Sequence, residues 1–117
     1  MMDNRMEYLL QVAHECILNS EYAIDTYIEE ENISNKLYVS LQFMNQAFQC
    51  AKQFQNQYYL IRESKGPNYL VEQFYHQFLF VNQEYLDSLK TDHSLQETHS
   101  EFKKLEDFYN ELRSSIE

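Results

Sequence analysis

The stretch Ser64-Lys65-Gly66-Pro67-Asn68 holds the only glycine and the only proline of this 117-residue chain. Gly66 suits the left-handed residue that closes a helix, and Pro67 suits the first turn of the helix that follows. A chain with so few turn residues cannot supply the many turns of an all-β domain. This stretch therefore predicts a sharp break between long helices near the middle of the chain.

Two further polar breaks lie on either side of this one. In the first, Asn32 or Ser34 can accept hydrogen bonds from the free amides that open the next helix. In the second, Ser94 followed by Glu97 makes a capping box. The three breaks predict four helices, over about residues 4–30, 34–63, 67–90 and 94–116.

Apolar residues recur at helical spacing within each of these segments. The clearest repeat is in the last one, where Leu95, Phe102 and Tyr109 lie seven residues apart. Such a repeat favours near-parallel packing around a shared seam, and short connections make neighbouring helices antiparallel. The predicted fold is all-α, a single antiparallel up-down-up-down four-helix bundle in which residues 1–117 form one domain. In the second helix, Leu37 and Leu41 are counted among the core residues.

The chain is strongly acidic, with 9 basic against 19 acidic residues and a formal net charge of −10. A negative surface repels phosphate, so we expect no direct binding to nucleic acid. There is no signal-peptide pattern, and no apolar run approaches the roughly 20 residues of a membrane span. We therefore expect a cytoplasmic protein that does not contact the membrane.

Neither cysteine has the spacing of a redox or metal motif. Cys16 and Cys50 both lie inside helical patterns, without a CxxC arrangement. Free cysteines pack as small apolar residues, so we expect buried free thiols. A disulfide between two facing helices would require an oxidising compartment.

The histidines do not form the motifs of a metal-binding bundle. Di-iron bundles use Glu-x-x-His on two helices, but the residue three positions before His14, His76, His93 or His99 is glutamine or lysine. Glu72 and His76 share a helix face, a spacing common in exposed hydrogen bonds. We expect no metal, no cofactor and no catalytic residues, and predict that the protein is not an enzyme.

The negative charge is concentrated toward the two ends of the chain. The net charge is −7 over residues 1–35, +3 over 36–65, −2 over 66–90 and −4 over 91–117. An up-down bundle brings its first and last helices side by side. A continuous acidic face across these two helices is therefore expected.

Two tyrosines of the first helix fall outside its apolar arc, among carboxylates. Tyr8 and Tyr22 share this outer side with Glu15, Asp25 and Glu29. Exposed tyrosines among acids are typical of a surface that docks a basic partner. We predict a non-enzymatic interaction or regulatory module that binds an unknown basic protein through the acidic face of the first and last helices, which carries these tyrosines. One alternative is an inhibitor that mimics the charge of DNA and binds a nucleic-acid-binding protein. Another alternative is a solvated surface that only keeps the protein soluble.

The third helix is apolar around a wide arc. Tyr69 and Phe80 point away from its predicted core side, and Leu79 is one of the residues that widen the apolar arc. Either this helix packs deeply, or its Leu79–Phe80 side meets another chain. A homodimer is the simplest such assembly. A small-molecule- or metal-binding bundle is a further alternative, with His14, Tyr75 and His76 as the polar groups of a pocket between helices.

The order and length of the helices, from Leu9-Leu10 through Pro67-Asn68-Tyr69 to the C-terminus, resemble the YppE-like family of small four-helix proteins from Gram-positive bacteria. The local anchor is the Pro-x-Tyr opening of the third helix, followed by about fifty residues in two helices. The resemblance implies a helical bundle in the cytoplasm. The family has no established activity, so the resemblance assigns no functional residue.

Overall fold

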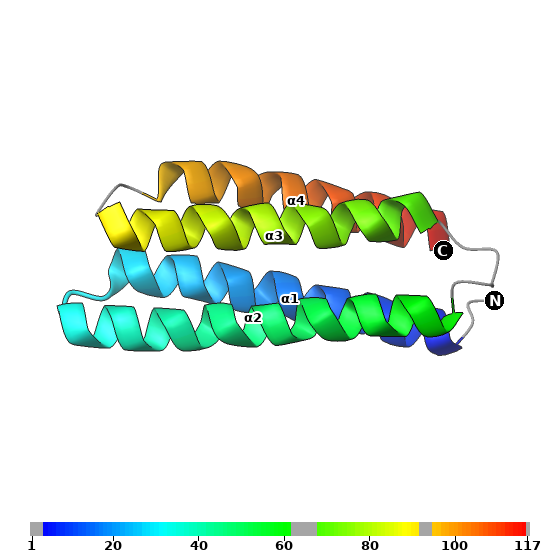
Figure 1. The fold of residues 1–117 in the computed structure, drawn as a ribbon, viewed down its shortest axis with the longest axis horizontal. Helices are drawn as coiled ribbons and strands as arrows, with labels where there is room; N and C mark the ends of the chain where they lie inside the picture. The colour runs from blue at the N-terminus through cyan, green and yellow to red at the C-terminus, as the bar shows by residue number, and fades with distance from the viewer. Residues whose placement is uncertain (1–3, 62–67, 92–94, 117) are drawn as a thin grey trace.

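The computed structural model describes residues 4–61, 68–91 and 95–116. Four helices account for nearly all of these residues: α1 (Asn4–Glu29), α2 (Ile33–Ile61), α3 (Asn68–Thr91) and α4 (Gln96–Ile116). Consecutive helices run antiparallel, and α1 and α3 each lie beside α2 and α4 (Figure 1). The predicted up-down-up-down four-helix bundle is therefore confirmed. None of the described helices combines the length and the apolar character needed to cross a membrane.

The start of α2 shows which of two candidate caps is used. The backbone N–H of Asn35 donates a hydrogen bond to Asn32 Oδ1 at 3.0 Å. This bond satisfies one of the amides left free at a helix N-terminus, so Asn32 is the cap rather than Ser34. The roles predicted for Gly66 and Pro67, and the Ser94 half of the capping box, fall outside the described residues.

The helices α1 and α2 are the most closely packed pair in the bundle. Their buried sides carry many small residues, namely Ala13, Cys16, Ser20 and Ala23 on α1, and Ser40, Ala47, Cys50 and Ala51 on α2. The distance between packed helices follows the size of the side chains between them. These small residues therefore allow the two backbones to approach closely.

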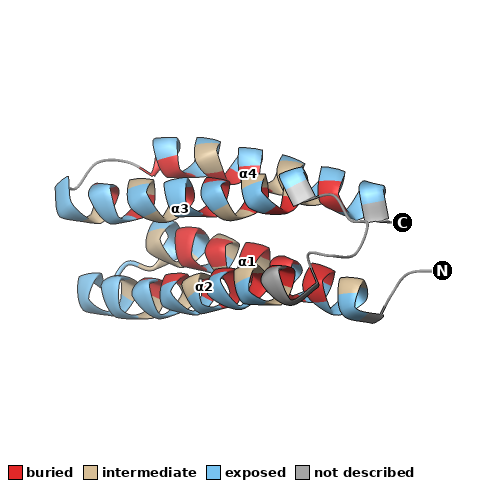
Figure 2. Cartoon of the chain, turned by 45° about the vertical axis from the view of Figure 1, so that its right-hand side comes forward, coloured by how far each residue is buried: buried red, intermediate tan, exposed pale blue. Residues whose placement is uncertain are grey.

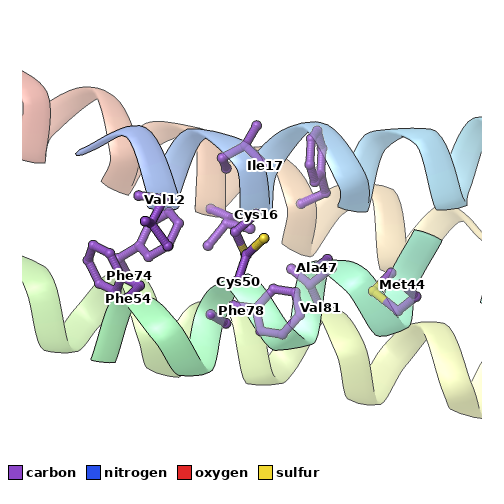
Figure 3. Close-up of a cluster of buried hydrophobic side chains, with 14 of the residues drawn as sticks. Val12, Cys16, Ile17, Met44, Ala47, Cys50, Phe54, Phe74, Phe78 and Val81 are labelled. Atoms are coloured by element: carbon purple, nitrogen blue, oxygen red, sulfur yellow. The ribbon is translucent and has the colours of Figure 1, made fainter. Parts of the chain in front are cut away.

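Larger side chains fill the space between the α1–α2 hairpin and the α3–α4 hairpin. Phe54 of α2 packs on Phe74 of α3 with ring centroids 4.9 Å apart (Figure 3). Phe74 also contacts Tyr109 of α4, at 6.4 Å. Figure 2 shows the buried residues along the inner sides of the helices and the exposed residues outside. Each buried aromatic ring contributes about 1.5–3 kcal/mol to the stability of the fold.

The predicted core was wrong at two positions of α2. Leu37 and Leu41 are 36% and 40% exposed. The 29 residues of α2 make it the longest of the described helices, and its N-terminal end extends slightly past the neighbouring end of α3 (Figure 1). Leu37 is near this end, whereas Leu41 lines an open hollow against Leu86 of α3. Apolar spacing shows which side of a helix faces inward, but it does not show where the neighbouring helix ends.

A buried hydrogen-bonded chain links three of the helices. Ser40 Oγ of α2 donates to the carbonyl oxygen of Ala23 on α1 at 2.7 Å, and it also pairs with Tyr85 Oη on α3. Because the Ser40 proton is used by Ala23, the Tyr85 hydroxyl donates to Ser40. Both side chains are fully buried. In the described part of the chain, no buried side-chain nitrogen or oxygen lacks a hydrogen-bond partner.

Replacing Ser40→Ala is expected to lower the free energy of unfolding by about 1–3 kcal/mol, because the Tyr85 hydroxyl stays buried without its acceptor. Urea denaturation followed by circular dichroism measures the change. Ser100→Ala, at an exposed position of α4, is the matched control and should change stability by less than about 0.5 kcal/mol. Equal effects of the two substitutions would contradict a stabilising role for the buried chain.

Alkaline pH should destabilise the fold partly through Tyr85. Burial raises the pKa of Tyr85 from 10.0 to about 12. Between these values the unfolded chain loses the proton and the folded chain keeps it, so stability falls as pH rises. In urea titrations with a reductant present, Tyr85→Phe should make this fall less steep. The exposed Tyr38→Phe should leave it unchanged, and identical profiles for the two variants would contradict the assignment.

Candidate functional site

Four exposed residues form a nearly straight line along α1. Tyr8, Glu15, Tyr22 and Glu29 follow one another at intervals of seven residues, which is about two helical turns or 10 Å. Tyr8 is 42% exposed and Tyr22 is 46% exposed, and both glutamates are exposed as well. We call these four residues the α1 stripe. Tyrosine and glutamate alternate along it.

The tyrosines of the α1 stripe are held from the side by α2. Gln53 Nε2 donates a hydrogen bond to Tyr8 Oη. The rings of Tyr22 and Phe43 lie 5.4 Å apart with their planes tilted by 56°. The sequence placed these tyrosines on a face shared by the first and last helices, whereas their contacts lie on the flank of α1 that faces α2.

Asp25 lies about one turn from Tyr22 and Glu29, at the edge of the exposed side of α1 that borders α4. It lines a hollow of about 160 Å³ together with Glu21 of α1 and with His99 and Lys103 of α4. The Lys103 ammonium is also 3.6 Å from Glu106 Oε1. The boundary between α1 and α4 therefore contains positive as well as negative charge. The predicted surface residues of α1 therefore extend from the flank that faces α2 to the edge that borders α4.

The two residues singled out on α3 do not form one patch. Leu79 is 37% exposed and Phe80 is 60% exposed. Phe80 lines a hollow beside Phe108 of α4. Leu86, seven residues after Leu79 and so on the same side of α3, instead lines a hollow of about 280 Å³ against Leu41 and other residues of α2.

The polar groups predicted for a pocket are also separated. Tyr75 and His76 of α3 line a hollow of about 150 Å³ with Tyr58 of α2. His14 lies between other helices, where its ring stacks on Tyr109 of α4 with centroids 5.7 Å apart. The structure thus brings two of the three predicted groups together and leaves His14 outside.

A hollow between α3 and α4 brings together residues that the sequence did not group. Its volume is about 300 Å³, and we call it the α3–α4 hollow. It is lined by Tyr69, Glu72, Gln73, His76, Gln77, Phe80 and Phe108. The sequence indicated only that Tyr69 and Phe80 both lie outside the core-facing side of α3. They are eleven residues, or about three helical turns, apart. The part played by Phe108 could not be seen without knowing how α4 packs against α3.

The two cysteines are buried free thiols, as predicted. Both belong to the apolar cluster between α1 and α2 (Figure 3). Burial is the main cause that raises the pKa of each thiol, and the negative charge of Glu15 adds to the shift at Cys50. A thiol with a raised pKa forms little of the thiolate that acts as nucleophile or metal ligand.

No group of three or more histidine, cysteine, aspartate or glutamate side chains within the described ranges is arranged to hold a metal ion. His93 lies outside those ranges. That the protein has no metal, cofactor or catalytic residue remains a prediction.

Comparison with known proteins finds no match: no family model fits the chain, and no curated protein and no solved structure is significantly similar to it. The resemblance to the YppE-like family remains a prediction.

The buried thiols should react slowly in the folded protein. We expect iodoacetamide at pH 8 to alkylate both cysteines roughly 100-fold or more slowly than in urea, because the reaction requires the fold to open. Cys50, which is 8% exposed, should react before Cys16, which is 0% exposed. Mass spectrometry of the cysteine peptides gives both rates, with the urea-unfolded chain as the control. A folded-state rate for Cys16 equal to the unfolded-state rate would contradict its burial.

Proposed function

We propose that this protein is a non-enzymatic interaction module that binds a basic protein partner through the α1 stripe and the acidic residues around it. The observation that carries the proposal is the exposed alternation of tyrosine and glutamate at Tyr8, Glu15, Tyr22 and Glu29. Carboxylates steer a basic partner toward the surface, and tyrosine rings supply contact area once it has docked.

The contacts with α2 prepare the tyrosines for binding. Gln53 holds the Tyr8 hydroxyl and Phe43 packs on the Tyr22 ring, so both rings are oriented before a partner arrives. Side chains that are already ordered lose less conformational freedom on binding, which favours affinity. The stripe thus combines charge with rings that are held in place.

The charge around the stripe supports a basic partner. Between Asn4 and Glu29, α1 has five acidic residues and one basic residue. On α2, the Lys52 ammonium lies 5.4 Å from the ring centre of Phe48, which itself contacts Phe78 of α3. The Lys52 charge is therefore on the flank of α2 that faces away from α1.

Carboxylate spacing favours an ordinary basic protein surface over the DNA-mimic alternative. The five acids of α1 run from Glu7 to Glu29, a length of about 33 Å at 1.5 Å per residue. They are on average about 8 Å apart along the helix, whereas DNA presents one phosphate per 3.4 Å along each strand. The acidic surface of α1 is sparser than the backbone it would imitate.

The proposed setting is regulation in the cytoplasm of a Gram-positive bacterium. Support for the setting comes from the resemblance to the YppE-like family. Self-association through α3 remains a separate prediction, which sedimentation of the purified chain tests directly.

Paired charge-neutral variants test the proposed surface. The full chain is immobilised, its partner is captured from the native cell, and the affinity of that partner is then measured at increasing salt. Glu15→Gln with Glu29→Gln should weaken binding about 2- to 30-fold, because each exposed charge pair contributes about 0.2–1 kcal/mol. Affinity should also fall as salt rises.

The matched control is Asp107→Asn with Glu111→Gln, which removes the same charge from exposed positions of α4. It should leave binding nearly unchanged. Equal losses from both variants, or an affinity that does not depend on salt, would contradict recognition by the α1 stripe.

A small-molecule site is the second candidate, favoured by the hollow that Tyr75 and His76 line between α2 and α3. Metal analysis of the purified protein tests whether this second site binds a metal ion. Stoichiometric metal would favour a metal-binding bundle over the interaction module.

A further inference from the structure

We propose that the α3–α4 hollow binds an organic cation, either a guanidinium or a quaternary ammonium group. Rings from two helices line the hollow, Tyr69 and Phe80 from α3 and Phe108 from α4, and Glu72 lies among them. Aromatic ring faces carry partial negative charge and attract cations. A nearby carboxylate adds a full negative charge to this attraction.

The exposure of these rings is unusual for their size. Tyr69 is 70% exposed and Phe80 is 60% exposed, whereas the other rings of α3 contribute to the buried core. Because eleven residues separate them along α3, Tyr69 lines one end of the hollow and Phe80, beside Phe108 of α4, lines the other. Gln73 Nε2 donates to Tyr69 Oη at 2.8 Å, so the phenol at one end of the hollow is held in position.

The polar side chain Gln77, which lines the hollow, is held in place by Glu101 of α4. Gln77, only 8% exposed, donates from Nε2 to the backbone oxygen of Glu101 at 2.8 Å and to Glu101 Oε2 at 2.7 Å. The hydrogen bond from Gln77, helped by Lys104, lowers the pKa of Glu101. The lining itself contains glutamate but neither lysine nor arginine. An anionic ligand would therefore meet repulsion there.

The size of the hollow favours a small group. Its volume of about 300 Å³ is at the lower end of the roughly 300–1,000 Å³ typical of small-molecule sites. The site is independent of the α1 stripe, because α3 lies diagonally across the bundle from α1. Failure at one surface therefore does not imply failure at the other.

A titration of the full-length chain, followed by the NMR shifts of its backbone amides, tests the proposal with three probes. Choline and N-acetylarginine methylamide supply the two cations, and 3,3-dimethylbutan-1-ol is the neutral analogue of choline. We expect a saturable response to a cation at Tyr69, Glu72, Phe80 and Phe108, with the neutral alcohol binding more weakly. A preference for the arginine derivative would indicate a protein side chain as the natural occupant, and a preference for choline would indicate a small ammonium compound.

Two substitutions and one control separate cation binding from simple apolar contact. Phe80→Leu keeps an apolar side chain but removes the ring, and should weaken cation binding about 2- to 5-fold, the range for an exposed ring. Glu72→Gln should also weaken it. Tyr38→Leu, at an aromatic residue of α2 that is 65% exposed, should leave it unchanged.

Four results would overturn the proposal. The first three are no saturable shift from either cation, equal affinity for choline and its neutral analogue, and equal weakening by the Phe80 and Tyr38 substitutions. Shifts at the same residues that depend on protein concentration alone would also overturn it, since a second copy of the chain would then occupy the hollow.

Discussion

The close approach of α1 and α2 is the constraint on which the other features of the bundle depend. It requires small side chains on both helices, and alanine, serine and cysteine occupy their buried sides. Small side chains bury little apolar area, so much of the buried area must come from larger residues. Most of the large buried rings lie between the α1–α2 hairpin and the α3–α4 hairpin. The pairing of Phe54 with Phe74 is the clearest contact of this kind.

This division also explains where the surface is smooth and where it is hollowed. Between α1 and α2 the narrow seam allows Gln53 and Phe43 of α2 to reach the tyrosines of α1, so that boundary becomes a line of supported side chains. Large residues lie along α3, and hollows lie on both of its flanks. The buried chain from Ser40 to Tyr85 fixes one hairpin against the other. The α1 stripe and the hollows beside α3 are therefore both consequences of how small and large side chains are distributed among the helices.

The fold could be predicted from sequence because four uninterrupted helical repeats and scarce turn residues leave few alternatives. The candidate surfaces could not be predicted to the same degree. The rotation of α1 decides whether Tyr8 and Tyr22 meet α2 or α4, and both tyrosines lie near the edge of the apolar arc. Phe80 and Phe108 share a hollow only because of how α3 packs on α4. Leu37 is exposed because of where a neighbouring helix ends. The apolar spacing within α2 gives no information about the length of that neighbour.

The central claim is that the packing of α1 on α2 leaves the α1 stripe as the surface that recognises a basic protein. The most direct measurement is an amide chemical-shift map of the isotope-labelled chain, recorded during titration with the partner that it captures. We predict that the largest changes occur on both sides of the α1–α2 boundary, around Tyr8, Tyr22, Phe43 and Gln53. Changes confined to α3 and α4 would contradict the claim.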